Sequence, residues 1–209
     1  MTALQIKQEL FALADEQKRE FLPYFFKTGE GQYGYGDKFI GVVVPKQRTL
    51  IKQYRTLELT EIEKLLNDQY HECRLTALLF LVDMYKKAKN DHKQQKTIYQ
   101  FYITHFQNIN NWDLVDLSAP NILGDYLLDK NYNELLCYAA SDHLWTQRIA
   151  IISTLEFIRN ERFEPTFEIS KILLNHSHDL IHKAVGWMLR EVGKKNYNAE
   201  YQFLTEENR

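Results

Sequence analysis

Apolar residues recur at three- and four-residue steps along almost the whole chain, with short polar breaks between the runs. This spacing predicts amphipathic helices, because it places the apolar side chains on one helical face. The helices are expected at roughly 2–13, 16–27, 46–56, 60–67, 69–88, 92–107, 111–128, 131–139, 142–159, 164–175, 179–194 and 197–205. The only β-like run is FIGVVV at 39–44, and it leads straight into Pro45. The pattern therefore predicts an all-α fold.

Three of the apolar stretches resemble one another, since each has a cation, a small residue and then an apolar ladder. They are RLTALLFLVDMY from Arg74, RIAIISTLEFI from Arg148 and KAVGWMLREVG from Lys183, and WDLVDLSAPNILGDYL falls between the first two. The starts lie about 35 to 37 residues apart, close to the period of two-helix HEAT or armadillo repeats. We therefore expect residues 1–209 to form a single domain, an α-α superhelix (solenoid) of HEAT-like helical repeats with one concave surface. An irregular helical bundle is the alternative.

One segment, KTGEGQYGYGDKFIG, lacks helical periodicity and holds five of the eight glycines. It predicts a Gly/Tyr-rich loop over 28–44, between the N-terminal helices and the repeat array. No strand precedes its glycines, so it is not a phosphate-binding loop.

Charge and cysteine content limit the classes of function. The formal net charge is −2 at pH 7, so any basic surface for a polyanion must be local. Cys73 and Cys137 have no CxxC or Cys/His spacing, and both are expected to be buried, reduced thiols. The seven histidines show no ligand spacing apart from HSH at 176–178, so no metal site or cofactor is expected. The N-terminus lacks a signal-peptide core and the longest apolar run, 77–82, is too short to span a bilayer, which predicts a cytoplasmic protein with no membrane partner.

The run NNWDLVD at 110–116 contains the candidate functional residues. Asp113 falls in the expected first turn of a helix, after an asparagine N-cap, where a negative charge meets the positive end of the helix dipole. Trp112 and Asp116 are four residues apart and share one helical face. A carboxylate at that position is solvated, paired with a cation such as Arg148 or Arg190, or kept for chemistry.

WDLVD at 112–116 with LGD at 123–125, LWTQRIAI at 144–151 and AVGWMLRE at 184–191 together resemble the HEAT-like-repeat DNA glycosylases, the AlkD-type DNA alkylation repair enzymes. The resemblance is strongest over 110–194 and extends weakly through GVVVPKQR at 41–48. It implies an α-helical solenoid that cradles duplex DNA on a positively charged concave face. It also implies excision of cationic alkylated purines such as 3-methyladenine and 7-methylguanine.

The resemblance assigns roles to individual residues. Asp116 matches the catalytic aspartate, and Trp112 and Trp187 match two tryptophans that flank it and hold the deoxyribose of the lesion. Arg148 matches a contact to the DNA backbone, and Tyr24 matches an aromatic residue near the DNA. In contrast, the remaining tryptophan, at position 145, has no carboxylate partner and is expected in the core.

Further cations cluster near the C-terminus of the chain. Lys183 and Arg190 are candidate DNA contacts, and a solvated charged face, which would also include Lys194 and Lys195, is the alternative. The loop at 28–38 is longer and richer in Gly and Tyr than the resemblance leads us to expect. It is either a DNA-facing lid or a connection.

The chemistry of these lesions explains why one carboxylate would suffice. A purine alkylated at N3 or N7 is already a cationic leaving group, so it needs no general acid. Asp116 would stabilise the oxocarbenium-like sugar and orient the water, and two indoles would add cation–π attraction. We therefore predict a monofunctional alkylpurine DNA glycosylase, a monomer without cofactor that acts on alkylated double-stranded DNA at the nucleoid. The alternative is a catalytically inactive HEAT-like relative that binds DNA structure or a protein partner.

Overall fold

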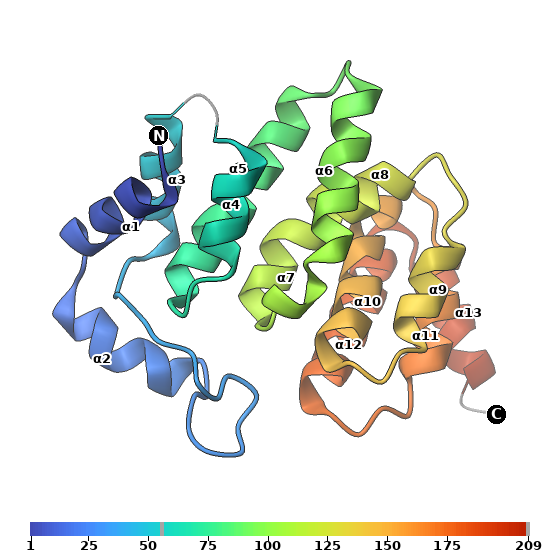
Figure 1. The fold of residues 1–209 in the computed structure, drawn as a ribbon. Helices are drawn as coiled ribbons and strands as arrows, with labels where there is room; N and C mark the ends of the chain where they lie inside the picture. The colour runs from blue at the N-terminus through green and yellow to red at the C-terminus, as the bar shows by residue number, and fades with distance from the viewer. Residues whose placement is uncertain (55–56, 208–209) are drawn as a thin grey trace.

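The structure, a computed structural model, describes residues 1–54 and 57–207, and most of this part of the chain is helical (Figure 1). The α-helices are α1 (Ala3–Ala12), α2 (Glu16–Phe25), α3 (Val44–Lys52), α4 (Leu59–Leu66), α5 (His71–Lys87), α6 (His92–Thr104), α7 (Trp112–Ala119), α8 (Asp125–Leu127), α9 (Asn133–Ala139), α10 (Leu144–Arg159), α11 (Glu164–Leu173), α12 (Asp179–Lys195) and α13 (Tyr197–Glu207). A 3₁₀ turn, η1 (Phe106–Asn108), precedes α7. In the described ranges there is no strand, and Lys38 and Tyr70 form only an isolated bridge. The all-α prediction is confirmed.

The FIGVVV run is an extended approach to a helix. It passes into α3 at Val44, and Pro45 occupies the first turn, where its fixed φ suits the helix and its missing N–H costs nothing. The predicted helix 46–56 corresponds to α3, and its residues 55 and 56 lie outside the described part of the chain.

The predicted helix 111–128 is interrupted by a π-helical segment, η2 (Pro120–Gly124), between α7 and α8. Pro120 has no N–H to donate and its ring crowds the preceding turn, so the regular hydrogen-bond pattern is disturbed there. At the other end of η2, a Cβ on Gly124 would lie 2.3 Å from the carbonyl oxygen of Ser153. Glycine therefore permits the close packing of η2 on α10.

Four helices form one continuous layer: α5 contacts α7, α7 contacts α10, and α10 contacts α12. We call these the inner helices. Other helices pack on this layer, with α4 and α6 on α5, α9 and α11 on α10, and α13 on α12, and we call these the outer helices. Figure 1 shows the chain advancing from α1 and α2 at one end to α13 at the other. Each pair buries its apolar face against the next pair, which confirms the predicted α-α solenoid.

Hydrogen bonds attach the segment between α2 and α3 to the inner helix α5. The carboxylate of Glu72, at the start of α5, accepts the backbone N–H groups of Ile40, Gly41 and Val42 at 2.9, 2.8 and 3.1 Å. Gly41 has φ +97°, and a Cβ there would lie 2.3 Å from the carbonyl oxygen of Asp15. The chain can make this turn only with glycine, because an L side chain would be strained and would clash.

The two cysteines differ in their exposure to solvent. Cys73 is buried, as predicted, and burial raises the pKa of its thiol to about 12. Cys137 is exposed, so the prediction of a buried thiol is wrong there. Leu135 and Ala139 supply the buried face of α9, and Cys137 lies between them on the other side of the helix.

Among the described residues, no helix is long and apolar enough to cross a membrane. No group of three or more His, Cys, Asp or Glu side chains in the same residues could hold a metal ion.

Candidate active site around Asp116

The helix α7 begins at Trp112, and Asn111 is its N-cap. The side chain of Asn111 is buried and its Oδ1 accepts the backbone N–H of Trp112 at 2.8 Å. Asp113 lies in the first turn, as predicted, and Asp116 follows one turn later.

Asp116 is held by an arginine from the next inner helix. Arg148 Nε donates to Asp116 Oδ1 at 3.0 Å, and Arg148 Nη2 donates to Oδ2 at 2.9 Å. The remaining terminal nitrogen, Nη1, donates to the carbonyl oxygen of Leu180 at 2.6 Å. Burial raises the pKa of Asp116 above its ordinary value, although the Arg148 guanidinium opposes this shift. Of the three states open to this carboxylate from sequence, the structure contains the ion-paired one.

The buried position of Arg148 does not match its expected role as a contact to the DNA backbone. The residue is only 5% exposed, and its guanidinium is used by Asp116 and the start of α12. Arg148 is therefore not the exposed cation that a phosphate contact requires in this conformation, and its contact with DNA stays a prediction. Its present geometry is that of a residue that orients Asp116.

Aromatic rings from α2 lie against Trp112. The indole of Trp112 is stacked on Phe26, with centroids 5.3 Å and planes 25° apart, and meets Phe25 edge-on at 5.8 Å. Tyr24, on the same helix, is 77% exposed, and the amino group of Lys27 lies 5.3 Å from its ring centroid. The sequence did not lead us to expect Phe25 and Phe26 beside Trp112, although the spacing of aromatic residues in α2 indicated an aromatic helix face.

A hollow of about 370 Å³ opens between these rings and α7. We call it the apolar recess, because carbon atoms make up nearly all of its surface. It is lined by Leu22, Phe25, Phe26, Phe39, Val42, Val43, Val44, Pro45, Gln47, His71, Glu72, Leu75, Trp112, Asp113, Asp116 and Leu117. Asp116 and Trp112 thus share one site.

Behind Trp112 lies a buried charge network that the sequence did not predict. His71 Nε2 is 2.9 Å from Asp113 Oδ2, and His71 Nδ1 is 3.2 Å from Asp37 Oδ2. Arg74 Nη2 donates to Asp37 Oδ1 at 2.6 Å. Burial opposes protonation of His71, but the two carboxylates outweigh it and raise the pKa of His71 to about 9. The imidazolium therefore joins the loop, α5 and α7.

Through Tyr33, the Gly/Tyr-rich loop contacts the inner helix α10 and the residue that precedes α12. The Tyr33 ring meets Trp145 edge-on at 5.9 Å and lies 6.4 Å from the ring of His178. Burial raises the pKa of the Tyr33 hydroxyl, and the Trp112 side chain opposes this shift. The loop thus places one side chain at the rim of the site, and its role as a DNA-facing lid or a connection stays a prediction. Trp145 is only 5% exposed, which confirms its predicted place in the core.

Trp187 lies apart from the apolar recess. It lines a separate hollow of about 360 Å³ with Leu155, Ile158, Arg159, Glu191, Lys194 and Lys195. Its indole N–H donates to Glu191 Oε1 at 3.1 Å, and the same oxygen accepts Lys194 Nζ at 2.7 Å. The structure therefore does not bring Trp187 into the recess with Trp112 and Asp116.

The other candidate DNA contacts share a helix with Trp187. Lys183 and Arg190 are exposed, and their four- and three-residue separations from Trp187 place all three on one face of α12. Lys183 Nζ is paired with Asp179 Oδ2 at 2.7 Å on the surface.

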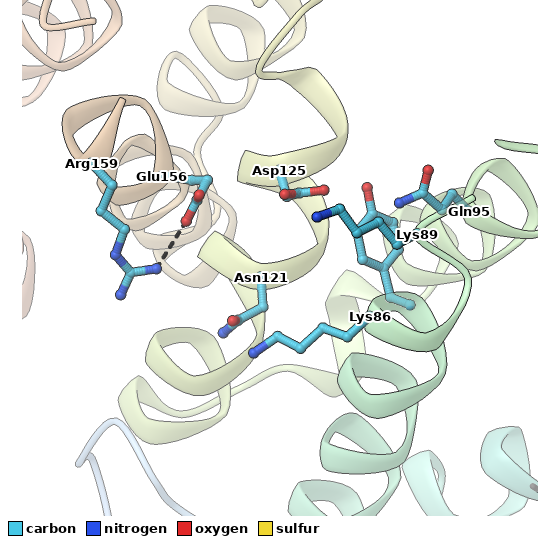
Figure 2. A pocket seen from close by; sticks show the side chains of 8 residues that line it. Lys86, Lys89, Gln95, Asn121, Asp125, Glu156 and Arg159 are labelled. Atoms are coloured by element: carbon cyan, nitrogen blue, oxygen red, sulfur yellow. Dashed lines mark hydrogen bonds and ion pairs between the residues drawn. The ribbon is translucent and has the colours of Figure 1, made fainter. Parts of the chain in front are cut away.

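A third hollow, of about 390 Å³, lies where α5 and α10 end (Figure 2). Figure 2 shows Lys86 from the end of α5, Lys89 from the turn that follows it, Asn121 from η2 and Arg159 from α10 around this space. Arg159 is paired with Glu156 at 2.9 Å. Tyr85, Gln95 and Asp125 complete the lining. Sequence reasoning missed this polar hollow. The available signal was that three of the four inner helices, α5, α10 and α12, carry cations in their last turn, where they also stabilise the helix dipole.

The fold and the site define a helical-repeat protein with a paired carboxylate beside an aromatic cleft. A sequence model of the family described as "DNA alkylation repair enzyme" matches residues 6–209, and the chain belongs to that family. The resemblance found in the motifs is thereby confirmed. Among solved structures, the chain is similar to a "predicted DNA alkylation repair enzyme from Enterococcus faecalis", with a TM-score of 0.69 and 17% identity over 92% of this chain and 89% of the other. No curated protein matches the sequence.

Proposed function

We propose that the protein is a monofunctional DNA glycosylase that hydrolyses the N-glycosidic bond of cationic N3- and N7-alkylated purines in duplex DNA. The observation that carries this proposal is the placement of Asp116, a carboxylate fixed by Arg148 on the wall of an aromatic cleft. Membership of the DNA alkylation repair enzyme family supports the class of substrate.

The geometry supports a catalytic role for a single carboxylate. The two Arg148 contacts occupy one side of the Asp116 carboxylate, and each carboxylate oxygen has a further lone pair. These remaining lone pairs can face the positive charge that develops on the sugar and can accept a hydrogen bond from the attacking water. A cationic purine leaves neutral, so a second carboxyl acting as general acid is not required.

The duplex would span several repeats. Trp112 beside Asp116, and Trp187 on α12, are the proposed contacts to the sugar of the lesion and its surroundings. Tyr24, Lys183 and Arg190 are exposed at either end of this stretch, where they would meet the DNA. Because Trp187 lies in a separate hollow, its contact requires the DNA to bridge α7 and α12.

The polar hollow is a proposed contact to the DNA backbone. Lys86, Lys89 and Arg159 place three cations around one space, next to the amide of Asn121. Such groups bind phosphate oxygens without reading sequence. They would supply the local basic surface that the near-neutral chain needs for duplex DNA, which we propose it binds as a monomer and without a cofactor.

A second candidate function is a binding protein without turnover. The observation that favours it is the Asp116–Arg148 ion pair itself, because the charge of this carboxylate is already paired within the protein. A purely structural pair would join two repeats and leave DNA binding intact.

Incubation with a duplex that carries a single N7-methylguanine separates the two functions. The proposed glycosylase releases free 7-methylguanine and leaves an abasic site under single-turnover conditions. Tight binding without release by the folded protein would establish the second function instead.

A further inference from the structure

His71, the first residue of α5, has a carboxylate at each ring nitrogen. Its Nε2 lies 2.9 Å from Asp113 Oδ2 on α7, and its Nδ1 lies 3.2 Å from Asp37 Oδ2 in the Gly/Tyr-rich loop. A neutral imidazole has one N–H, so one of the two carboxylates would face a ring lone pair. The side chain is only 2% exposed, and water does not replace a lost contact there. This geometry fits the imidazolium, which donates to both carboxylates.

The charged groups around His71 also favour a protonated ring. Asp37 and Asp113 bring two negative charges, whereas Arg74, which donates to Asp37 Oδ1 at 2.6 Å, brings one positive charge. Glu72, the next residue of α5, is used by the backbone N–H groups of residues 40–42. Burial lowers the pKa of His71, but the two carboxylates outweigh it and raise the pKa to about 9. The imidazolium therefore supplies the positive charge that balances the second carboxylate.

The imidazole packs on the aromatic rings that support Trp112. It lies 4.8 Å from the ring centroids of both Phe26 and Phe39, at interplanar angles of 35° and 23°. Phe26 in turn is stacked on the indole of Trp112 at 5.3 Å. A cation is attracted to the face of an aromatic ring, and this attraction weakens when the proton is lost.

Asp113 connects His71 to the first turn of α7. It directly follows Trp112, and Asp116 lies three residues further along the same helix. The contact from His71 to Asp113 therefore restrains the turn that carries the indole. His71 reaches Trp112 by two routes, through Asp113 on its own helix and through the Phe26 ring.

We propose that the imidazolium of His71 is a positioning residue, which holds the indole of Trp112 in the orientation that contacts the sugar of the lesion. This inference rests on the proposed function. With a neutral ring, one carboxylate contact is lost and Trp112 is held less firmly beside Asp116. Excision by the wild type therefore falls as pH rises through the range in which His71 loses its proton.

The first test compares single-turnover excision of N7-methylguanine by wild type and His71→Gln between pH 6 and pH 10. Glutamine keeps an N–H donor for one carboxylate but carries no charge. Its rate at pH 6 should be lower by about tenfold, the factor that corresponds to one charge-assisted hydrogen bond, and the two rates should approach each other by pH 10. Their ratio removes the effect of pH on the lesion and on the duplex. A ratio that does not change with pH would overturn the proposal.

His92→Gln is the matched control, because it makes the same change at an exposed position of α6. It should keep the wild-type rate at every pH. Circular dichroism at each pH establishes that the compared proteins are folded. A tenfold loss in His92→Gln as well would show a general effect of removing a histidine.

Asp37→Asn distinguishes positioning by charge from a loss of packing. It removes one carboxylate that favours the imidazolium, so the midpoint of the decline in excision should move to lower pH. Asp142→Asn, at an exposed position after α9, should leave this midpoint unchanged. A lower rate in Asp37→Asn with an unmoved midpoint would contradict the proposal. Neither the wild-type profile nor this variant depends on whether His71→Gln folds.

A spectroscopic titration separates the role of His71 from the glycosylase activity. The three tryptophans are labelled with 5-fluorotryptophan, and their ¹⁹F resonances are followed from pH 6 to pH 10. The Trp112 resonance should shift with a midpoint near pH 9, and this transition should be absent from His71→Gln. Trp187, in its separate hollow, should not show it.

The two measurements fail in different ways. If wild type releases no lesion, the proposed function fails, and the Trp112 titration still decides whether His71 positions this indole. If the lesion is released but neither the rate ratio nor the Trp112 resonance follows the His71 proton, the positioning role alone fails.

Discussion

Arg148 binds both carboxylate oxygens of Asp116, through Nε at 3.0 Å and through Nη2 at 2.9 Å, and it also donates to the Leu180 carbonyl oxygen at 2.6 Å. A single side chain of α10 thus connects the candidate catalytic residue on α7 to the start of α12. The orientation of Asp116 depends on the packing of three consecutive inner helices.

Asp116→Asn should lose most excision and keep the fold. Asparagine retains the shape and one acceptor for Arg148 but removes the charge that faces the oxocarbenium-like sugar. By comparison with other electrostatic stabilisers, the single-turnover rate should fall by about 10²–10³. Asp142→Asn, at an exposed position after α9, is the control and should excise normally. Near-normal excision by Asp116→Asn would remove this residue from the mechanism.

Arg148→Ala should lower stability more than DNA affinity. Removing one partner of a buried pair leaves Asp116 uncompensated, which typically costs about 3–5 kcal/mol. We expect a lower midpoint of chemical denaturation and an unchanged salt dependence of binding to undamaged duplex. The role implied by the resemblance predicts the opposite, a salt slope smaller by about one unit because a phosphate contact is lost. Both quantities should be measured on the same preparation.

The double variant Lys86→Ala/Lys89→Ala should weaken binding to damaged and undamaged duplex alike. Two phosphate contacts correspond to a loss of about 1.8 units in the slope of log K against log salt. The control is Lys93→Ala/Lys96→Ala, which removes the same charge from exposed positions of the outer helix α6. An equal loss in both double variants would show a general charge effect and not a contact in the polar hollow.

The buried contacts of His71 predict that the folded protein loses stability at alkaline pH. The pKa of His71 is raised from 6.5 to about 9 in the folded protein, so folding favours the protonated form. Its contribution is fully present below pH 6.5 and is lost as pH rises through about 9. Below pH 6.5, the protonation of this buried group contributes on the order of 3 kcal/mol to the free energy of unfolding. Denaturant titrations of wild type and His71→Asn at pH 6 and pH 10 should converge at the higher pH. A difference independent of pH would contradict a protonated His71.

Only lesions with a formal positive charge should be released. The other ionisable groups of the site are engaged within the protein, Glu72 with three backbone N–H groups and Asp113 with His71. Asp116 is thus the carboxylate left for the reaction, and it cannot protonate a poor leaving group while it is ionised. A panel of duplexes with uracil, 8-oxoguanine, hypoxanthine or 7-methylguanine, assayed for abasic sites, should give product with the last alone. Efficient release of uracil would require an acid that the present site does not include.

The repeat architecture was predictable because helical periodicity and repeat spacing are local properties. Pro120 marked a disturbance inside the expected helix 111–128, but a π turn depends on how η2 packs against α10. Cys137 was placed wrongly because an apolar neighbourhood does not tell which side of a helix faces the core.

The site was predictable in part. The four-residue spacing placed Trp112 and Asp116 on one face, and Arg148 was among the partners considered for the carboxylate. The contacts of His71 to Asp37 and Asp113 span 34 and 42 residues, and no local pattern indicates which distant carboxylates meet a histidine. The apolar recess likewise arises where α2 meets α7, and no local pattern indicates that these two helices face each other.

The helix α2 buries none of its residues, and Pro23 removes one of its internal hydrogen-bond donors. Local opening is easiest where little apolar surface is buried, so α2 unfolds at lower free energy than the inner helices do. The same helix supplies Phe25 and Leu22 to the recess. A ligand that contacts Phe25 and Trp112 together would hold α2 against α7. The affinity for such a ligand would then include the free energy of ordering one wall of the binding site.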